Sequence, residues 1–221
     1  MGIFHYDNKV MSIFSKVMDA VILGVLWLAC CLPVVTIGAA SSAFYYAYNK
    51  SVRQDRGYAW QTFFYGFRSN FKQATGLWLA LLGMLVFTVA DYVILNAYTN
   101  ALPFAKVLMG CMIAAFVYLI VWGLYLFAYI SRFDTDAKNA RKMCARLILE
   151  NPLWSVALLL VFGICVLSVI LVSFVAIVIP AVYIALANGI LERVFQKYMT
   201  EQDMQKERSY TAKDENPTQA D

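Results

Sequence analysis

The chain has 221 residues, of which 62% are hydrophobic and only 14% are charged. Ordinary soluble domains have about 45–50% apolar and about 25% charged residues, and a chain of this length cannot hide so much apolar surface in its interior. The composition excludes a soluble enzyme, a nucleic-acid-binding domain and a disordered chain. The net charge of +4 does not indicate nucleic-acid binding, because the Lys and Arg residues flank long apolar runs. The sequence therefore predicts an integral membrane protein.

The first uncharged run covers residues 20–49. Pro33 and Gly38 lie in its middle, and they predict a helix break because proline lacks a backbone N–H. A helix over residues 10–32 could be followed by a return stretch over residues 39–48, which would make two crossings. The same run could instead form one long kinked span.

Three further uncharged or nearly uncharged runs follow, over residues 74–105, 107–131 and 151–191. A spanning helix needs about 20 residues, and the backbone groups in hydrocarbon must bond internally, so these runs should be helical. The first two runs predict one span each. The third is about twice as long as one span needs, which predicts two spans with a turn near Ser173 and a kink at Pro180 in the last helix.

The distribution of Lys and Arg predicts the orientation. Residues 50–72 and residues 132–150 contain five basic residues each, whereas the connection before the third predicted span contains only Lys106. The positive-inside rule places the two basic segments in the cytoplasm, together with the C-terminus, because Arg193 and Lys197 follow the last span. An N-terminus inside the cell requires six spans, and one outside requires five.

Both basic segments show helical amphipathicity. One face of the first contains only aromatic residues, at positions i, i+3, i+4, i+7 and i+11: Trp60, Phe63, Phe64, Phe67 and Phe71. Such a helix suits the headgroup plane of a membrane, with its rings toward the lipid. Residues 138–148 show a weaker version of the same pattern.

These observations predict an all-α, polytopic transmembrane helical bundle of five to six spans with cytoplasmic amphipathic helices. The transmembrane domain covers residues 1–198. Residues 199–221 mix charges of both signs with few apolar residues, which predicts a disordered cytoplasmic tail.

Two polar residues are candidate functional groups. Asp91 is the only carboxylate inside an apolar run, and intramembrane acids often mark functional sites. Its place about 25 Å along the predicted helix also suits an acid at the membrane surface, which could pair with Lys106. Asn188 could bind a substrate or make a hydrogen bond between helices.

No catalytic, cofactor-binding or metal-binding constellation is recognisable. The single histidine is His5, the five cysteines lack metal-ligand spacing, and no phosphate-binding glycine loop occurs. We therefore expect no enzyme activity, no cofactor and no metal.

Several short motifs carry a family resemblance: residues 32–38, Gly57-Tyr58, Phe63-Phe64 and residues 67–74. They resemble the YesL-type family of bacterial membrane proteins, a family of unknown function common in Gram-positive bacteria. The resemblance implies a multi-pass protein of the bacterial plasma membrane. Family members often lie beside genes for carbohydrate ABC transporters, glycoside hydrolases and sensor systems, which implies an accessory role in carbohydrate uptake or sensing.

Two functions remain open from the sequence. The first is a non-enzymatic accessory component whose partners are the lipid bilayer and carbohydrate ABC transporter or sensor components, with no nucleic acid. The alternative is a self-sufficient small-solute transporter or channel. The broken helix and Asp91 favour this alternative, whereas the small number of intramembrane polar groups counts against a sugar pathway.

Overall fold

The computed structural model describes residues 4–54, 57–97, 104–133, 136–172 and 177–199. These residues form helices and short connections without any strand, which confirms the predicted all-α fold. Seven α-helices lie in this described part: α1 (Phe4–Cys31), α2 (Ile37–Ala47), α3 (Ala59–Ala97), α4 (Ala105–Arg132), α5 (Ala137–Glu150), α6 (Pro152–Leu171) and α7 (Ile179–Tyr198). A short 3-10 turn precedes α2, and a π-helical segment, Tyr48–Arg53, follows it.

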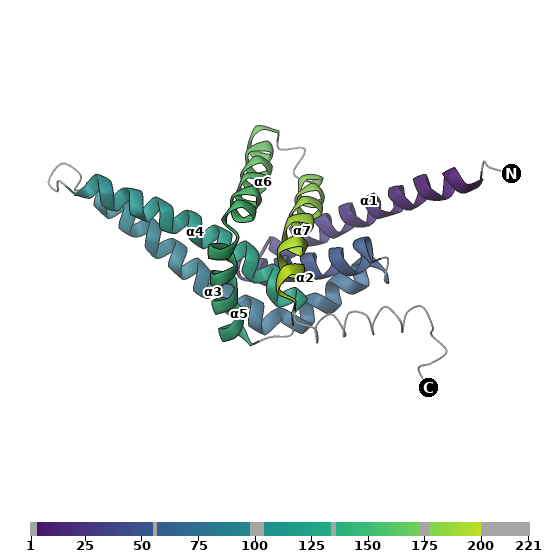
Figure 1. Cartoon of the computed structure of the whole chain (residues 1–221), viewed down its shortest axis with the longest axis horizontal. Helices are drawn as coiled ribbons and strands as arrows, with labels where there is room; N and C mark the ends of the chain where they lie inside the picture. Colours follow the sequence, from purple (N-terminus) through teal and green to yellow (C-terminus); the bar gives the residue numbers. More distant parts are fainter. Residues whose placement is uncertain (1–3, 55–56, 98–103, 134–135, 173–176, 200–221) are drawn as a thin grey trace.

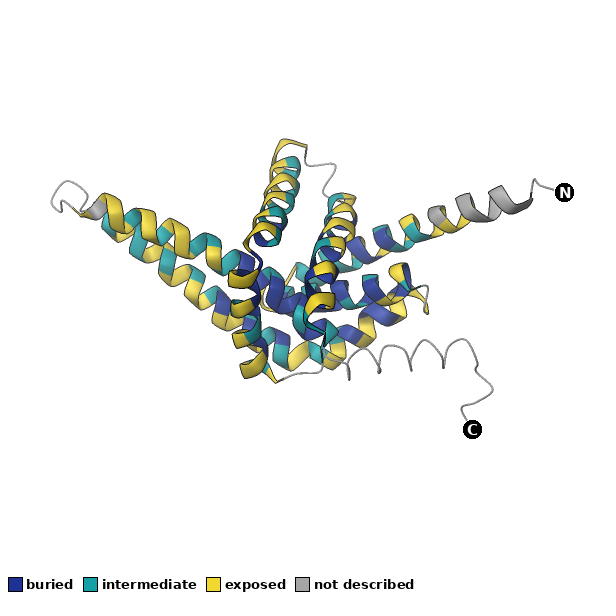
Figure 2. Ribbon diagram, viewed as in Figure 1, coloured by how far each residue is buried: buried dark blue, intermediate teal, exposed yellow. Residues whose placement is uncertain are grey.

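The helices spread like a fan from a common base (Figure 1). α3 and α4 run side by side as one arm, α1 extends in the opposite direction, and α6 and α7 rise between them. The largest fully buried side chains belong to one hydrophobic cluster that joins α1, α3, α4 and α7: Leu23, Phe63, Tyr125 and Phe195. Many residues of α3, α4 and α6 are exposed to the surroundings of the protein (Figure 2).

Four of the described helices are long and apolar enough to cross a membrane, over Phe14–Cys31, Ala59–Ala97, Lys106–Arg132 and Pro152–Leu171. This number corrects the expected five to six spans. α2 has 11 residues and reaches about 16 Å, whereas the hydrocarbon core is about 30 Å thick. α7 has 20 residues, but its second half contains three charged residues.

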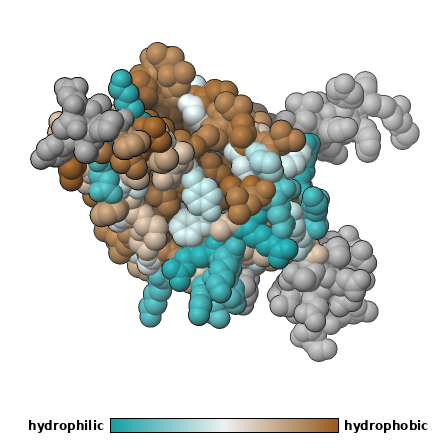
Figure 3. Space-filling view, turned by 60° about the vertical axis from the view of Figure 1, so that its left-hand side comes forward, coloured by the Kyte–Doolittle hydropathy of each residue, from teal (hydrophilic) through white to brown (hydrophobic). Residues whose placement is uncertain are grey.

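One face of the molecule separates into hydrophobic and hydrophilic regions, as expected of a membrane protein. In Figure 3 hydrophobic residues cover the upper part of the molecule and hydrophilic residues gather along its lower side. We call this lower side, where α5 and the C-terminal turn of α7 lie, the polar end.

The chain reverses direction after α1. The helix ends at Cys31, two residues before Pro33, and α2 then folds back onto it. The Trp27 indole N–H donates to the Ser41 hydroxyl at 3.2 Å, and the rings of Trp27 and Phe44 stack with centroids 5.8 Å apart. The run over residues 20–49 is therefore a helical hairpin whose second arm is shorter than a span.

Gly38 lies inside α2, at the point where α2 crosses its neighbours. A Cβ atom added there would overlap the Cβ of Trp78 and the carbonyl oxygen of Ala74 on α3, and would lie 3.0 Å from the Phe127 ring on α4. The indole N–H of Trp78 also donates to the carbonyl of Val34 at 2.7 Å. The absence of a side chain at Gly38 therefore permits close packing of three helices.

The aromatic face of the first amphipathic segment is divided between core and surface. This segment is the start of α3, which continues without a break for 39 residues, about 58 Å. Phe63 is fully buried and stacks on the half-buried Phe67, whereas Trp60, Phe64 and Phe71 are exposed. The segment thus belongs to the same rigid helix as the following span.

The second amphipathic segment forms α5, whose apolar face packs against the protein. Ala140, Cys144 and Leu147 are buried in the hydrophobic cluster, and the indole N–H of Trp122 on α4 donates to the carbonyl of Arg141 at 3.3 Å. The opposite face is basic and exposed: Lys138, Arg141, Lys142 and Arg146. We call these four residues the α5 basic face.

The run over residues 151–191, predicted to form two spans, contains two helices as expected, but only α6 is a candidate span. The expected turn near Ser173 lies outside the described residues, as do all residues of the predicted tail except Met199. Pro180 is the second residue of α7, where its missing N–H would lack a partner in any case. It therefore begins the last helix and does not kink it.

Candidate functional site

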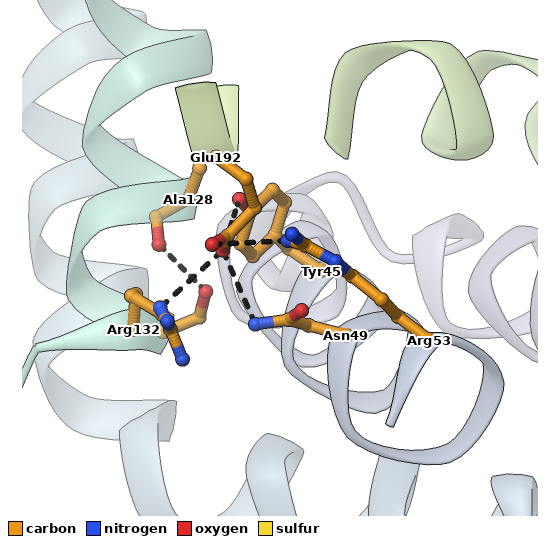
Figure 4. Close-up of polar contacts among 7 residues, drawn as sticks. Tyr45, Asn49, Arg53, Ala128, Arg132 and Glu192 are labelled. Atoms are coloured by element: carbon orange, nitrogen blue, oxygen red, sulfur yellow. Dashed lines mark hydrogen bonds and ion pairs between the residues drawn. The ribbon is translucent and has the colours of Figure 1, made fainter. Parts of the chain in front are cut away.

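The structure brings four polar residues, Tyr45, Asn49, Arg53 and Arg132, together around one buried carboxylate, that of Glu192 on α7 (Figure 4). Its Oε1 accepts hydrogen bonds from the Tyr45 hydroxyl at 3.1 Å and from Asn49 Nδ2 at 3.2 Å. Arg53 Nη1 lies 3.0 Å from Oε2, and Arg132 Nε lies 3.3 Å from Oε1. We call these five residues the Glu192 cluster.

The donors come from two separate parts of the chain. Tyr45, Asn49 and Arg53 follow each other at intervals of four residues, so they share one face of α2 and its π-helical continuation. Single π-helical turns occur often at functional sites. Arg132 is the last residue of α4, so the cluster joins α2, α4 and α7 across as many as 147 sequence positions.

The cluster carries one negative and two positive charges. The Glu192 side chain is only 2% exposed, while those of Arg132 and Arg53 are 13% and 40% exposed. Burial raises the pKa of the Tyr45 hydroxyl well above its ordinary value, and the nearby Glu192 carboxylate raises this pKa further. Tyr45 therefore stays protonated and donates to Glu192.

An aromatic shell covers the cluster on one side. Phe195 lies almost one turn after Glu192 on α7, and its buried ring contacts four others edge to face. The centroid distances are 6.5 Å to Tyr45, 6.5 Å to Tyr125, 5.9 Å to Tyr129 and 5.8 Å to Phe133. These rings exclude water and so strengthen the charged contacts beside them.

Asn188 precedes Glu192 by one turn of α7 and is only 2% exposed. Its Nδ2 has no hydrogen-bond partner within the described part of the chain, and the same holds for Oδ1 of Asn49 in the cluster. Buried polar atoms are usually hydrogen-bonded, so these two atoms leave unused hydrogen-bonding capacity close to the charged centre.

Asp91 is not among the residues around Glu192; it lies within two turns of the C-terminal end of α3, where its side chain is half-buried. Lys106 near the start of α4 is exposed, and no ion pair joins it to Asp91 among the described residues. The structure therefore does not bring the two sequence-predicted polar residues, Asp91 and Asn188, into one site.

Sequence reasoning missed Glu192 as the centre of a site. This residue directly follows an apolar run, so it resembles an ordinary charge at the end of a helix. The missed signal is a matching period of four residues: polar side chains at Tyr45, Asn49 and Arg53 on one segment, and Asn188 and Glu192 on another.

The chemistry available to the cluster is that of a charged joint. A carboxylate held by two guanidinium groups can fasten three helical segments, because removing one partner of a buried ion pair is strongly destabilising. The described residues contain no group of three His, Cys, Asp or Glu side chains that could hold a metal ion.

An apolar cavity of about 660 Å³ lies next to the cluster. Each of six helices contributes at least one aromatic side chain to its wall: Trp27, Phe44, Trp78, Phe127, Phe162 and Tyr183. Tyr45 belongs to both features, because its ring lines the cavity while its hydroxyl binds Glu192.

Comparison with known protein families gives a match over part of the chain. Residues 20–92 match a family described as protein of unknown function, DUF624. The matched residues include Tyr45, Asn49 and Arg53 but neither Arg132 nor Glu192. No curated protein and no solved structure matches the chain. This part of the chain is therefore similar to an uncharacterised family.

Proposed function

We propose that this chain is a non-enzymatic accessory protein of a carbohydrate uptake or sensing system in a bacterial plasma membrane. In this proposal the polar end and the C-terminus face the cytoplasm, and the α5 basic face docks an acidic surface of a transporter or sensor component. The resemblance to YesL-type proteins supports the carbohydrate connection, and the excess of Lys and Arg at the polar end supports the orientation.

The observation that carries this proposal is that α5 packs its apolar face against the protein core and exposes its basic face. Ala140, Cys144, Leu147 and Ile148 already pack in the protein core, and Leu149 near the end of the helix is its one large apolar side chain that is exposed, so this helix has no continuous apolar face to insert into lipid. Four basic side chains remain exposed on a firmly held helix, and complementary charge is what steers such a surface to a protein partner.

The Glu192 cluster gives this face a physical connection to the membrane helices. α5 follows α4 after a short connection, and the last residue of α4 is Arg132 of the cluster. A partner that displaces α5 would therefore act on the contact between α4 and α7.

The exposed rings of the first amphipathic segment support a second contact, with the lipid bilayer. Trp60, Phe64 and Phe71 are exposed near the basic side chains of Arg68 and Lys72 on the same helix. Aromatic rings and basic side chains are common at the membrane surface, so this part of α3 anchors the polar end there.

Co-purification tests the docking role. Recovery of a transporter or sensor component from mildly solubilised membranes should be compared between wild type and a Lys138→Glu/Lys142→Glu variant. We expect the variant to lose most of the bound component. A Lys106→Glu variant, with its charge change at the far tip of α4, is the matched control and should bind normally. Equal recovery by all three proteins, or no such component with wild type, would refute the proposal.

The alternative function, a small-solute transporter or channel, is favoured by the apolar cavity beside a buried charged cluster. The lining suits an apolar or amphiphilic solute better than a sugar, because a sugar needs many hydrogen-bonding groups. Uptake of candidate solutes into liposomes containing the purified protein, with and without a proton gradient, tests this function. Uptake no faster than in empty liposomes would exclude it.

A further inference from the structure

The apolar cavity has the size and the lining of a ligand site. Binding pockets for small ligands typically enclose about 300–1,000 Å³ and are mostly apolar with a few polar groups. The cavity encloses about 660 Å³ among six helices, and its wall is almost entirely hydrocarbon and aromatic.

The cavity opens toward the surface of the candidate spans. Val166 and Ile170 on α6 line it, and these side chains are also 43% and 71% exposed. Both belong to a helix that is apolar enough to cross a membrane. The opening therefore faces the hydrocarbon of the bilayer, which makes a lipid the available occupant.

The depth of the cavity matches one leaflet. Along α7 the lining extends from Ile179 to Leu191, a rise of about 18 Å. The hydrocarbon core of a bilayer is about 30 Å thick, so each leaflet contributes about 15 Å. A single acyl chain of one leaflet can fill this length.

The two ends of the cavity differ in whether the hydroxyl groups of the wall already make hydrogen bonds. The hydroxyl of Ser41 accepts from Trp27, and that of Tyr45 donates to Glu192, so both are engaged. Tyr183 also lines the cavity, one turn from the start of α7, and its hydroxyl makes no hydrogen bond to any described residue. This hydroxyl is a free donor at the end of the cavity farther from the Glu192 cluster.

We propose that the cavity binds one acyl chain of a membrane phospholipid. The chain enters between the helices from the leaflet at the Tyr183 end and runs toward Tyr45. The Tyr183 hydroxyl donates a hydrogen bond to an ester carbonyl of the lipid.

A photoactivatable phospholipid, with a diazirine near the end of one acyl chain, tests this site on the full-length protein in detergent. We expect labelling to saturate at one lipid per chain, and peptide mapping to find the label on cavity residues of α2 and α7. An excess of unlabelled phospholipid should compete with the labelling. Label spread over outward-facing residues, or labelling that unlabelled phospholipid does not reduce, would overturn the proposal.

Two substitutions on the same helix provide the matched comparison. Val169→Trp places a large ring in the cavity and should reduce the saturable labelling severalfold, whereas Leu167→Trp on the outer surface should leave it unchanged. Undiminished labelling of a folded Val169→Trp protein would refute the site. If that variant does not fold, Tyr183→Phe decides: weaker lipid binding supports the proposal, and wild-type affinity contradicts the role of the hydroxyl.

Discussion

At the scale of single residues, the fold depends on a few positions whose surroundings tolerate little change of side chain. Glu192 is buried and satisfied only by partners from other segments, and Gly38 lies where three helices touch. Both positions have counterparts of the same residue type in open surroundings, which permits matched tests.

Glu192→Gln should lower the free energy of unfolding by about 3 kcal/mol, because removal of one partner leaves buried guanidinium charge uncompensated. We place the effect at the lower end of the usual range because the Arg53 side chain is 40% exposed. Unfolding in detergent micelles, followed by circular dichroism, measures the change. Glu150→Gln, which removes an exposed pair with Arg146, is the control and should unfold like wild type. Equal stability of both variants would show that the cluster is not a structural joint.

Gly38→Ala should destabilise the protein by about 1–3 kcal/mol, since the added methyl group overlaps the neighbouring helix and the backbone of Ala74 cannot move aside easily. Gly76→Ala is the control, because a Cβ atom at that position meets nothing within 4 Å. There the higher helix propensity of alanine should raise stability by up to about 1 kcal/mol. The thermal midpoints of both variants measure this difference, and midpoints changed in the same direction would contradict the packing described.

The Tyr45 hydroxyl predicts a loss of stability at alkaline pH. Its pKa in the folded protein lies well above the ordinary value of 10.0, so the folded state retains its proton where the unfolded state releases it. This contribution is complete below pH 10 and is lost as the pH rises above that value. A comparison of wild type and Tyr45→Phe between pH 8 and pH 12 tests this. The variant should show a shallower decline, and parallel curves would contradict the effect.

At the scale of helices, the sequence allowed good prediction where hydrocarbon imposes the structure. The uncharged runs are helical because backbone groups in lipid must bond within their own segment. The end of α3 nearest the polar end was harder to predict. Lys72 indicates where the membrane begins, but no proline interrupts residues 59–97, so the helix continues past the charge. Charge patterns thus locate the membrane boundary and not the helix boundary.

The site could not be predicted to the same extent. The four-residue spacing of the polar side chains is visible in the sequence on each of the two segments. No local pattern, however, shows that Tyr45 and Glu192, 147 positions apart, come into contact. The count of spans was too high for a related reason. The prediction divided residues 151–191 into two spans from the length of the uncharged run alone. The second helix, α7, continues to Tyr198 and therefore includes the charged residue Glu192.

At the scale of the whole molecule, the proposed orientation predicts that the polar end and the start of α4 are accessible from opposite sides of the membrane. In a background without native cysteines, Lys138→Cys on α5 should react with a membrane-impermeant maleimide only after the cells are permeabilised. Lys106→Cys at the tip of α4 should react in intact cells. Labelling of both positions from the same side would refute the orientation.

The joint at Glu192 also has a consequence for how the protein is made. The ribosome completes Arg53 long before Glu192, and at about 5–20 residues per second the interval is roughly 7–28 seconds. During this time Arg53, at the end of the π-helical segment that follows α2, lacks the carboxylate that pairs with it in the complete protein. A chain that stops before α7 leaves the Arg53 guanidinium without this carboxylate, so we expect such a truncated chain to be degraded faster than the complete protein.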